Sequence, residues 1–316
     1  MIEKIDLLTE KIKNAKSIAI AGHKNPDGDS LCSALALMQI IELNFGKKST
    51  VIYDGNLPKY LQNVPLRKCA QFYERVPDDA KFDLVLIVDY GTRTHLGGAG
   101  KYVDAADFIV EFDHHFNDDL VGNLCFDDAT KAATGQVIYD VARRAKWNMD
   151  QDIIDLLTLA IITDTGNFKF VKDSKVLRDV ADLVDSGANI PDLINVLNNR
   201  DKKTVLVESK AAVNAEFLMK NRLVIATIDL QDYKKLDGRG ETVLGTLGQI
   251  HGVEYVVLLK EQKENQIGIS LRSKTEPINK IAESFGGGGH LFAAGAVVQD
   301  SLGNVRERII NAFKGK

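Results

Sequence analysis

The sequence predicts an α/β fold: a parallel-sheet N-terminal domain plus a smaller α/β C-terminal domain. Short, almost uniformly apolar runs occur at 17–21, 83–88 and 108–112, and a helix-like segment at 30–45 follows the first of them. Near-continuous apolar strands separated by helices indicate a parallel sheet covered on both faces. After a long helical stretch, strand character resumes at 222–228 and begins a second α/β unit.

The elements of the first half follow from local patterns. The first sixteen residues have a helical apolar spacing without a secretory apolar stretch: Ile2, Ile5, Leu8 and Ile12. Strands are predicted at 17–21, 49–53, 83–88 and 108–112. The helix at 30–45 ends at Gly46, a residue suited to the left-handed conformation at a helix C-terminus. From 135 to about 220 the pattern is mostly helical, with a turn at 189–191.

The second half repeats the alternation on a smaller scale. Strands are predicted at 222–228, 253–260, 266–271 and 294–298. A helix at 277–285 precedes a glycine run, and a final helix ends the chain. We therefore predict a first domain at 1–190, a helical linker at 191–221 and a second domain at 222–316.

Composition excludes several classes of protein. The 316 residues suffice for two domains, and 45% hydrophobic with 27% charged residues argues against disorder. A net charge of −4 disfavours a long duplex nucleic acid as partner, because such binding needs clustered basic surface. Three cysteines without CxxC spacing argue against a disulfide scaffold or structural zinc. The longest apolar runs fall short of the roughly 20 residues of a membrane helix, so we expect a soluble, cytoplasmic protein without membrane partners.

Acidic and imidazole groups follow three of the predicted strands. They are His23, Asp27 and Asp29 after the first, Asp89 after the second, and Asp113, His114 and His115 after the third. In an open parallel sheet, ligands bind outside the carboxyl ends of the strands. We therefore expect these segments, distant in sequence, to converge.

Simpler interpretations exist for each segment alone. Pro-Asp-Gly-Asp is typical of a turn in which Asp29 or Ser30 caps the following helix, and Asp89 suits a loop. Helix capping, however, does not require imidazoles. Asp164 follows an apolar helix, where a carboxylate meets the negative end of the helix dipole unless a cation offsets it.

The donor types indicate a metal centre. Imidazole nitrogens and carboxylate oxygens without thiolate suit Mn²⁺, Fe or Mg²⁺ better than structural zinc. Eight candidates exceed the needs of one ion, and two ions about 3.5–4 Å apart, bridged by one carboxylate, would use them. Such a pair activates a water and stabilises in-line displacement at phosphorus, so hydrolysis of phosphate esters is the first hypothesis.

The second domain contains a candidate phosphate-binding segment. Gly286, Gly287, Gly288 and Gly289 precede His290, and successive glycines let backbone N–H groups surround an anion. A flexible loop is the alternative. Arg272, followed by Ser273 at the end of a predicted strand, could donate to the same phosphate.

Together these motifs resemble the DHH phosphoesterases with their DHH-associated C-terminal domain. The resemblance covers nearly the whole chain and implies an active site in the cleft between the domains. It implies one Mn²⁺ on His23, Asp27 and Asp89, and a second on Asp29, Asp89, His114 and Asp164, with Mg²⁺ or Co²⁺ as substitutes. Asp89, Asp113 and His115 would be catalytic, with Asp113 orienting its neighbours. The phosphate would be bound by His115, Arg272, Ser273, Gly286, Gly287, Gly288, Gly289 and His290.

Within this family the sequence is similar to the bacterial nanoRNase and pAp phosphatase type. The resemblance implies hydrolysis of short oligoribonucleotides and dinucleotides such as pApA, with 3′-phosphoadenosine 5′-phosphate (pAp) as a further substrate and a homodimer as the assembly. Tyr90 and the pair Leu291 and Phe292 depart from common family residues and bear on substrate preference. An inorganic pyrophosphatase or polyphosphatase and a non-catalytic dinucleotide sensor stay open as alternatives, as do the main substrate, the metal used and the polarity of degradation.

Overall fold

The computed structural model describes residues 1–116, 120–171, 173–236 and 240–314, with the side chains of Lys59 and His290 left out. The chain forms two compact units, Met1–Asn199 and Arg200–Lys316, and each is described by itself. Both predicted parts of the α/β fold are present. The helix Ile190–Asn198 packs Leu193 into the first core, whereas Lys202–Val213 packs Val207 into a core of the second unit.

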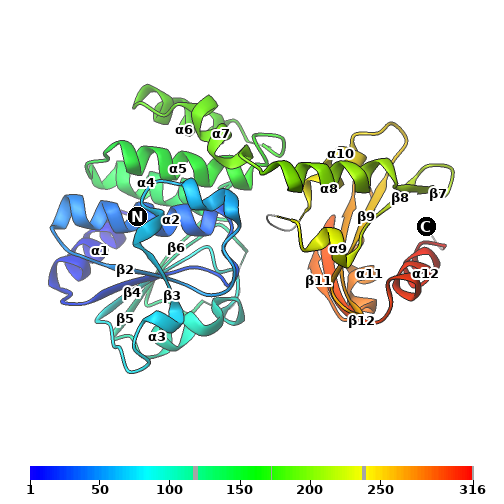
Figure 1. The fold of residues 1–316 in the computed structure, drawn as a ribbon. Helices are drawn as coiled ribbons and strands as arrows, with labels where there is room; N and C mark the ends of the chain where they lie inside the picture. The colour runs from blue at the N-terminus through cyan, green and yellow to red at the C-terminus, as the bar shows by residue number, and fades with distance from the viewer. Residues whose placement is uncertain (117–119, 172, 237–239, 315–316) are drawn as a thin grey trace. The chain divides into compact units, whose positions relative to one another are not determined.

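The first unit contains six strands and seven α-helices among its described residues (Figure 1). The strands are β1 (Ile18–Ala21), β2 (Thr50–Tyr53), β3 (Ala70–Phe72), β4 (Leu84–Val88), β5 (Phe108–Asp113) and β6 (Leu124–Asp127). The helices are α1 (Ile2–Asn14), α2 (Gly28–Phe45), α3 (Gly100–Asp104), α4 (Thr134–Ala145), α5 (Gln151–Asp164), α6 (Ser174–Asp185) and α7 (Ile190–Asn198). Short 3₁₀ turns occupy Lys59–Asn63, Arg67–Cys69, Tyr73–Arg75 and Arg93–Ala99.

The six strands form one parallel sheet in the order β3-β2-β1-β4-β5-β6. The chain order reverses between β1 and β4, and in such sheets the ligand crevice lies at the carboxyl ends of the strands beside the reversal. Side chains alternate between two cores. Ile20 and Leu86 join the core under α1, α2, α4 and α5, whereas Ala21 and Ile87 join the core beside α3.

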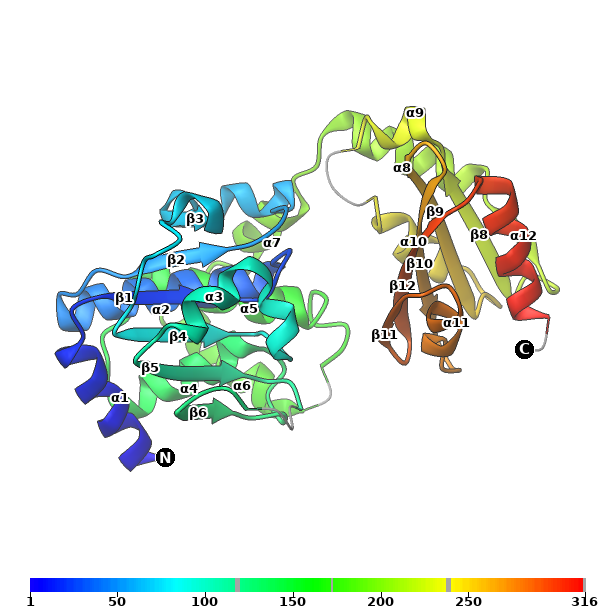
Figure 2. The same ribbon diagram turned by 90° about the horizontal axis from the view of Figure 1, so that it is seen from below.

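The helices are distributed unequally over the two faces of this sheet. Figure 2 shows α3 on one face, whereas α2 and α4 cover the other and α5 packs on α2. Because α2 lies between the sheet and α5, nearly all of its first fourteen residues are buried. A Cβ at Gly28 would lie 2.3 Å from Thr163 Cγ2, so the start of α2 and the end of α5 are in close contact. This approach brings Asp29 and Asp164 to one place.

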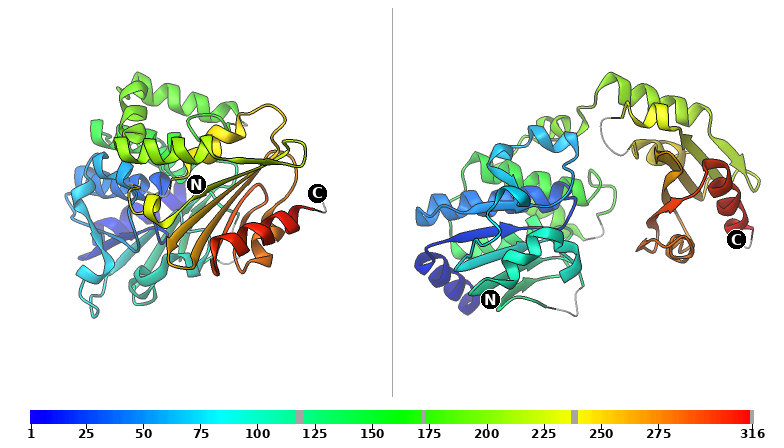
Figure 3. Two further views of the ribbon diagram at one scale, coloured as in Figure 1. Left: turned by 45° about the vertical axis from the view of Figure 1, so that its right-hand side comes forward. Right: turned by 60° about the horizontal axis from the view of Figure 1, so that its bottom comes forward.

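The second unit is built on a mixed sheet in the order β11-β12-β10-β9-β8-β7 (Figure 3). Its strands are β7 (Glu216–Leu218), β8 (Leu223–Ile228), β9 (Tyr255–Lys263), β10 (Gln266–Ser273), β11 (Gly288–His290) and β12 (Ala293–Gln299). Its helices are α8 (Lys202–Val213), α9 (Leu230–Tyr233), α10 (Thr242–Gly248), α11 (Asn279–Ser284) and α12 (Leu302–Phe313). Among the described strands of this second sheet, β8 and β9 pair in parallel and the other pairs are antiparallel.

Some short elements escaped the sequence analysis. The strands β3, β6 and β7 have three or four residues, and β3 and β7 contain polar or exposed positions, so no apolar run marks them. The helix that was predicted at 30–45 is α2, and it starts two residues earlier than expected, at Gly28. No helix among the described residues is both long and apolar enough to cross a membrane.

Candidate metal centre

The carboxyl ends of β1, β4 and β5 and the starts of α2 and α4 meet at one edge of the first sheet. The structure brings all six predicted metal-binding residues together there, and His115 lies beside them. They fall into three overlapping groups whose ligand atoms lie within 4.8 Å of one another. The groups are His23–Asp27–Asp89, Asp29–His114–Asp164 and Asp89–His114–His115.

The first group surrounds the Nε2 atom of His23. The carboxylate oxygens of Asp27 and Asp89 each lie 3.6 Å from this nitrogen. The other ring nitrogen, Nδ1, lies 2.9 Å from the backbone carbonyl of Lys24. Because a carbonyl oxygen only accepts, Nδ1 donates this hydrogen bond, and Nε2 is the atom that faces the two carboxylates, as in metal-bound histidines.

Asp27 also caps a helix. Its Oδ1 accepts a hydrogen bond from the backbone N–H of Ser30 at 3.1 Å, so Asp27 is the N-cap of α2. The simpler interpretation in which Asp29 or Ser30 is the cap was wrong, because α2 already begins at Gly28. Capping and metal binding are compatible here. The capping atom Oδ1 lies 3.6 Å from His23 Nε2, and the second carboxylate oxygen of Asp27 does not take part in the cap.

The second group surrounds Nε2 of His114. Oxygens of Asp164, Asp89 and Asp29 lie at 3.1, 3.5 and 3.8 Å from it. The nitrogen is buried and has no hydrogen-bond partner of acceptable geometry within the described part of the chain. A buried imidazole nitrogen aimed among three carboxylates, without a hydrogen bond, fits a ligand whose lone pair points at a cation.

Asp89 belongs to two of the three groups. It follows β4 in a left-handed backbone conformation with φ of 51°, which L-residues other than Gly rarely adopt. Its side chain is buried, and Oδ1 is 3.3 Å from Thr134 Oγ1. Backbone strain of this kind persists where surrounding structure enforces it, and it is concentrated at functional sites.

Asp113 holds the surrounding loops rather than facing the groups directly. Its two oxygens accept five hydrogen bonds: from the N–H groups of Tyr90, Gly91, His114 and His115, and from Nδ1 of His115. Burial raises the pKa of Asp113, but these hydrogen bonds outweigh it and lower the pKa to about 2. Asp113 therefore stays ionised and fixes the loops after β4 and β5 to each other.

The carboxylates of the cluster lie close together and shift the pKa values of one another and of the neighbouring histidines. Burial raises the pKa of Asp29 well above its ordinary value, and neighbouring Asp89 raises it further. Burial lowers the pKa of His114, but the carboxylates of Asp164, Asp89 and Asp29 around its ring outweigh this and raise the pKa to about 11. His23 behaves likewise: hydrogen bonding and charge from Asp27 outweigh burial and bring its pKa to about 9. This cluster of carboxylates and histidines therefore has an excess of negative charge, which bound divalent cations would neutralise.

The sequence analysis missed the residues that hold Asp29. The backbone N–H groups of Thr134 and Gly135, at the start of α4, donate to its two oxygens at 2.6 and 2.9 Å. Ser33 Oγ, one helical turn along α2, adds a third hydrogen bond at 3.0 Å. Asp29 thus lies at a helix N-terminus, where the dipole favours an anion. Only a Thr-Gly pair before a helix signals this in the sequence, and that signal is not specific.

These residues fit a divalent metal centre. The donor set contains only carboxylate oxygens and imidazole nitrogens, which suit Mn²⁺, Fe²⁺ or Mg²⁺. Asp89 belongs to the group of His23 and also lies 3.5 Å from His114 Nε2 of the other group, the position expected of a carboxylate between two ions. The unpartnered Nε2 of His114 and the orientation of His23 are independent observations in favour.

In the second unit, Arg272 lies in a charged network that sequence reasoning did not anticipate. Glu241 accepts hydrogen bonds from Ser270 Oγ at 2.9 Å, Lys260 Nζ at 3.2 Å and Arg272 Nη2 at 3.2 Å. Burial raises the pKa of Glu241, but the positive charges of Lys260 and Arg272 outweigh it and lower the pKa. Lys260 is buried, so Glu241 is its counter-ion and fixes Arg272 as well.

The glycine run is more ordered than a loop. Gly288 and Gly289 belong to β11 and pair with Gly295 and Ala294 of β12, so the alternative of a flexible loop was wrong there. A Cβ at Gly287 would lie 2.0 Å from the carbonyl oxygen of Gly295, which explains one glycine by packing. Gly286 has a φ of 75°, which explains another. The side chain of His290 lies outside the described residues.

The comparisons with known proteins follow this division. Residues 17–161 match the DHH family, N-terminal domain, and residues 222–315 match the DHHA1 domain. The chain contains a DHH domain and a DHHA1 domain. The predicted resemblance is confirmed, and the first unit contains the DHH domain, the second the DHHA1 domain.

Relatives extend over nearly the whole chain. A Streptococcus mutans protein named probable bifunctional oligoribonuclease and PAP phosphatase NrnA is 27% identical, covering 90% of this chain and 91% of its own. The Thermus thermophilus bifunctional oligoribonuclease and PAP phosphatase NrnA is 27% identical over 99% and 94%. An exopolyphosphatase-related protein from Bacteroides fragilis shares the fold, with a TM-score of 0.90 at 20% identity over 99% and 96% of the chains.

Proposed function

We propose that this protein is a metal-dependent phosphoesterase that hydrolyses short oligoribonucleotides and dinucleotides to mononucleotides and removes the 3′-phosphate of pAp. The observation that carries the proposal is the pair of ligand groups that share Asp89 at the edge of the DHH sheet. Relatives that extend over nearly the whole chain are named as oligoribonucleases and PAP phosphatases, which supports the substrate class.

The centre would hold two divalent ions, with Mn²⁺ as the first candidate. One set would consist of His23, Asp27 and Asp89, the other of Asp29, Asp89, His114 and Asp164. When bound, such a pair of ions acidifies a water and offsets charge on the phosphoryl oxygens. The protein contributes the arrangement: Asp113 fixes the two loops, and α4 holds Asp29 in one orientation.

His115 is the proposed phosphate-contacting residue of the DHH domain. Its Nδ1 lies 2.7 Å from Asp113 Oδ1, so that nitrogen carries a proton and Nε2 is left for substrate. This hydrogen bond raises the pKa of His115 and outweighs burial, which favours the protonated ring. A protonated imidazole donates a charge-assisted hydrogen bond to a phosphate oxygen.

In the DHHA1 domain we propose that Arg272, Ser273, the segment Gly286–Gly289 and His290 bind a substrate phosphate. Arg272 suits this role because a guanidinium can donate two parallel hydrogen bonds to one phosphate. One of its nitrogens is engaged with Glu241, which orients the group. We further propose a cytoplasmic homodimer that takes short RNA and small nucleotides and excludes long duplexes.

The test is a substrate panel with purified protein and Mn²⁺. It compares pAp, pApA, a labelled trinucleotide, a 24-mer and pyrophosphate, each beside the D89N variant and beside D78N as a matched control. Asp78 is exposed and lies outside the metal centre. We expect release of mononucleotide from pApA and the trinucleotide and of phosphate from pAp, little from the 24-mer, and none with D89N.

Each alternative predicts a different pattern. Phosphate release from pyrophosphate alone would make the protein a pyrophosphatase. Tight dinucleotide binding in calorimetry without turnover would make it a sensor. Equal activity of wild type and D89N would remove the metal centre as the catalytic site.

A further inference from the structure

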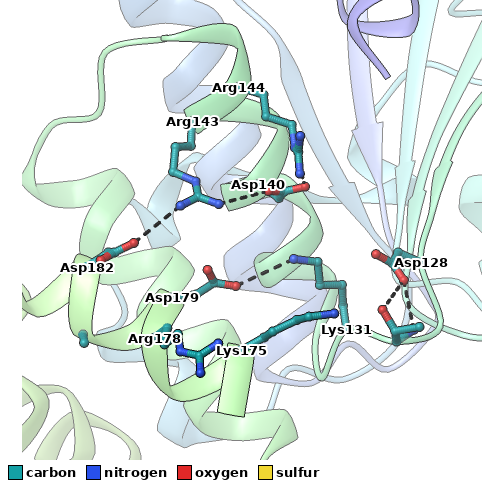
Figure 4. A pocket seen from close by; sticks show the side chains of 11 residues that line it. Asp128, Lys131, Asp140, Arg143, Arg144, Lys175, Arg178, Asp179 and Asp182 are labelled. Atoms are coloured by element: carbon teal, nitrogen blue, oxygen red, sulfur yellow. Dashed lines mark hydrogen bonds and ion pairs between the residues drawn. The ribbon is translucent and has the colours of Figure 1, made fainter. Parts of the chain in front are cut away.

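A cavity of about 560 Å³ lies in the DHH domain outside the metal centre. It is formed by α4, α6 and the loop 128–133 between β6 and α4 (Figure 4). Its charged lining residues are Asp128, Lys131, Asp140, Arg143, Arg144, Lys175, Arg178, Asp179 and Asp182. Cavities of this volume accept small organic molecules or part of a larger ligand.

The four carboxylates of the cavity are already engaged. Asp140 accepts from Arg143 and Arg144, at 3.3 and 2.8 Å, and Arg143 also lies 3.5 Å from Asp182. The other two acids are held by a residue of α4 and by the loop 128–133. Gln136 Nε2 donates to Asp179 at 2.6 Å beside Lys131 at 3.7 Å, while Asp128 accepts from Thr130.

Positive charge is left over on α6. Arg178 forms no hydrogen bond or ion pair with any residue that the structure describes, and the ion pair of Lys175 with Asp173 is long, at 3.9 Å. Both residues lie in the first turns of α6, where the helix dipole adds to the attraction for anions. In Figure 4 they extend from α6 beside Asp179, with Lys175 reaching toward Lys131. The cations with the weakest compensation, Lys175 and Arg178, therefore lie together on the α6 wall of the cavity.

The same loop connects this cavity to the metal centre. The backbone N–H of Asp128 donates to the carbonyl of Asp113 at 3.0 Å. At the other end, Thr134 contacts both Asp29 and Asp89. Lys131 lies three residues from Thr134, so their Cα atoms are at most about 11 Å apart. Lys131 also lies 3.7 Å from Asp179 of α6, so this loop contacts the cavity wall at one point and the metal centre at both of its ends.

We propose that Lys175 and Arg178 form a subsite for a backbone phosphate of the RNA substrate, beyond the nucleotide that reacts. This inference rests on the proposed function and adds a determinant of substrate length to it. pAp contains a single nucleoside and does not extend to such a subsite, whereas an oligonucleotide does. The subsite therefore acts on long members of the substrate class and leaves the shortest one unaffected.

The experiment compares the K175Q/R178Q double variant with wild type on pAp, pApA, a trinucleotide and a pentanucleotide. A control variant, K68Q/R75Q, removes two exposed cations of the same domain that do not line the cavity. Because a hydrogen bond to a charged group contributes appreciably, we expect kcat/KM on the pentanucleotide to fall about tenfold. We expect pAp hydrolysis within about twofold of wild type, an unchanged Tm, and a shallower salt dependence for the pentanucleotide.

The outcomes separate the inference from the function on which it rests. Equal losses on pAp and on the pentanucleotide, or no loss on either, overturn the subsite. Absence of hydrolysis of every substrate by wild type overturns the proposed function itself. A free nucleotide is the other source of the same phosphate chemistry, so AMP is added to the pAp assay. A response to AMP that the double variant loses would assign the cavity to a free nucleotide and overturn the RNA subsite.

Discussion

The two domains each concentrate charge around a buried residue, but with opposite balance. In the DHH domain, four carboxylates surround His23 and His114, and the nearby groups raise the pKa of both imidazoles. In the DHHA1 domain, one carboxylate, Glu241, lies between Lys260 and Arg272 and has a lowered pKa. The first cluster has more negative charge than its own side chains neutralise, and the second has more positive charge.

This difference indicates what each cluster binds. Excess negative charge in a buried site is stabilised by divalent cations, and excess positive charge by an anion such as phosphate. The two are also built differently. The DHH cluster combines segments up to 141 positions apart, from His23 to Asp164, whereas two neighbouring strands and a single acid form most of the DHHA1 network.

Replacing Asp89, the carboxylate that both proposed ion sites share, should lower activity more than any other change. With D89N, both ligand groups lose a charge, and we expect kcat with Mn²⁺ to fall by at least about 10³-fold, since metal ions supply several kcal/mol of transition-state stabilisation. Steady-state kinetics on pAp and metal content by mass spectrometry are the measurements. The exposed D78N variant should match wild type, and a D89N enzyme that retained full activity would contradict the bridging role.

A second variant tests whether Asp113 positions the metal ligands without binding the metal itself. D113N weakens the five hydrogen bonds that hold the loops after β4 and β5. Changes to residues that orient metal ligands typically lower metal affinity about 10–100-fold. We expect the Mn²⁺ concentration for half-maximal activity to rise by that factor and saturating Mn²⁺ to restore part of kcat. The exposed D107N variant is the control, and an unchanged Mn²⁺ requirement would argue against positioning.

On the DHHA1 side, E241Q should affect substrate binding more than turnover. Without the carboxylate, Arg272 is no longer oriented, and we expect KM to rise about fivefold with kcat within twofold, as removal of one charged hydrogen bond predicts. Lys260 also loses its counter-ion, which destabilises the domain. The double variant E241Q/K260M removes that buried charge, so its Tm should recover while KM stays high. Recovery of both would mean that Glu241 has only a structural role.

The smallest expected effect is on the pH dependence of stability. The raised pKa values of His23 and His114 mean that protonation stabilises the metal-free fold. This contribution is complete below the ordinary pKa of 6.5 and is lost as pH rises through about 9 for His23. Burial of Asp29 and Asp89 acts in the same direction, because their ionisation costs more as pH rises above the ordinary 3.8.

We therefore expect the Tm of chelator-treated protein to fall by a few degrees between pH 6.5 and pH 9, and Mn²⁺ to reverse the fall. Calorimetry over this range is the measurement. H23Q should flatten the dependence, and H251Q, a change at an exposed histidine, should leave it as in wild type. A Tm that rose with pH in the metal-free protein would contradict the charge balance of the cluster.

Much of the site was predictable because the geometry of a parallel sheet places these residues close together. His23, Asp89 and His114 follow separate strands, and the carboxyl ends of parallel strands share one edge, so their convergence needs no tertiary detail. Asp164 was recognisable from its unfavourable place at a helix C-terminus. Thr134 was not, because its role is a backbone N–H donated to a carboxylate 105 residues away.

The DHHA1 domain shows the opposite case. The sequence favoured a phosphate-binding segment for the glycine run, with a flexible loop as the alternative, and did not reveal that β11 pairs with β12 or that Gly287 packs closely against Gly295. Glu241 precedes a short helix with no motif around it, and only the fold places it under Arg272. The strands β3 and β6 were missed because three or four residues carry too little periodicity.

The most direct test is a crystal structure of the Mn²⁺-loaded protein with anomalous data at the manganese edge. We expect two anomalous peaks about 3.5–4 Å apart, one between His23 and Asp27, the other between His114 and Asp164, with Asp89 between them. A single peak, or peaks away from these side chains, would contradict it.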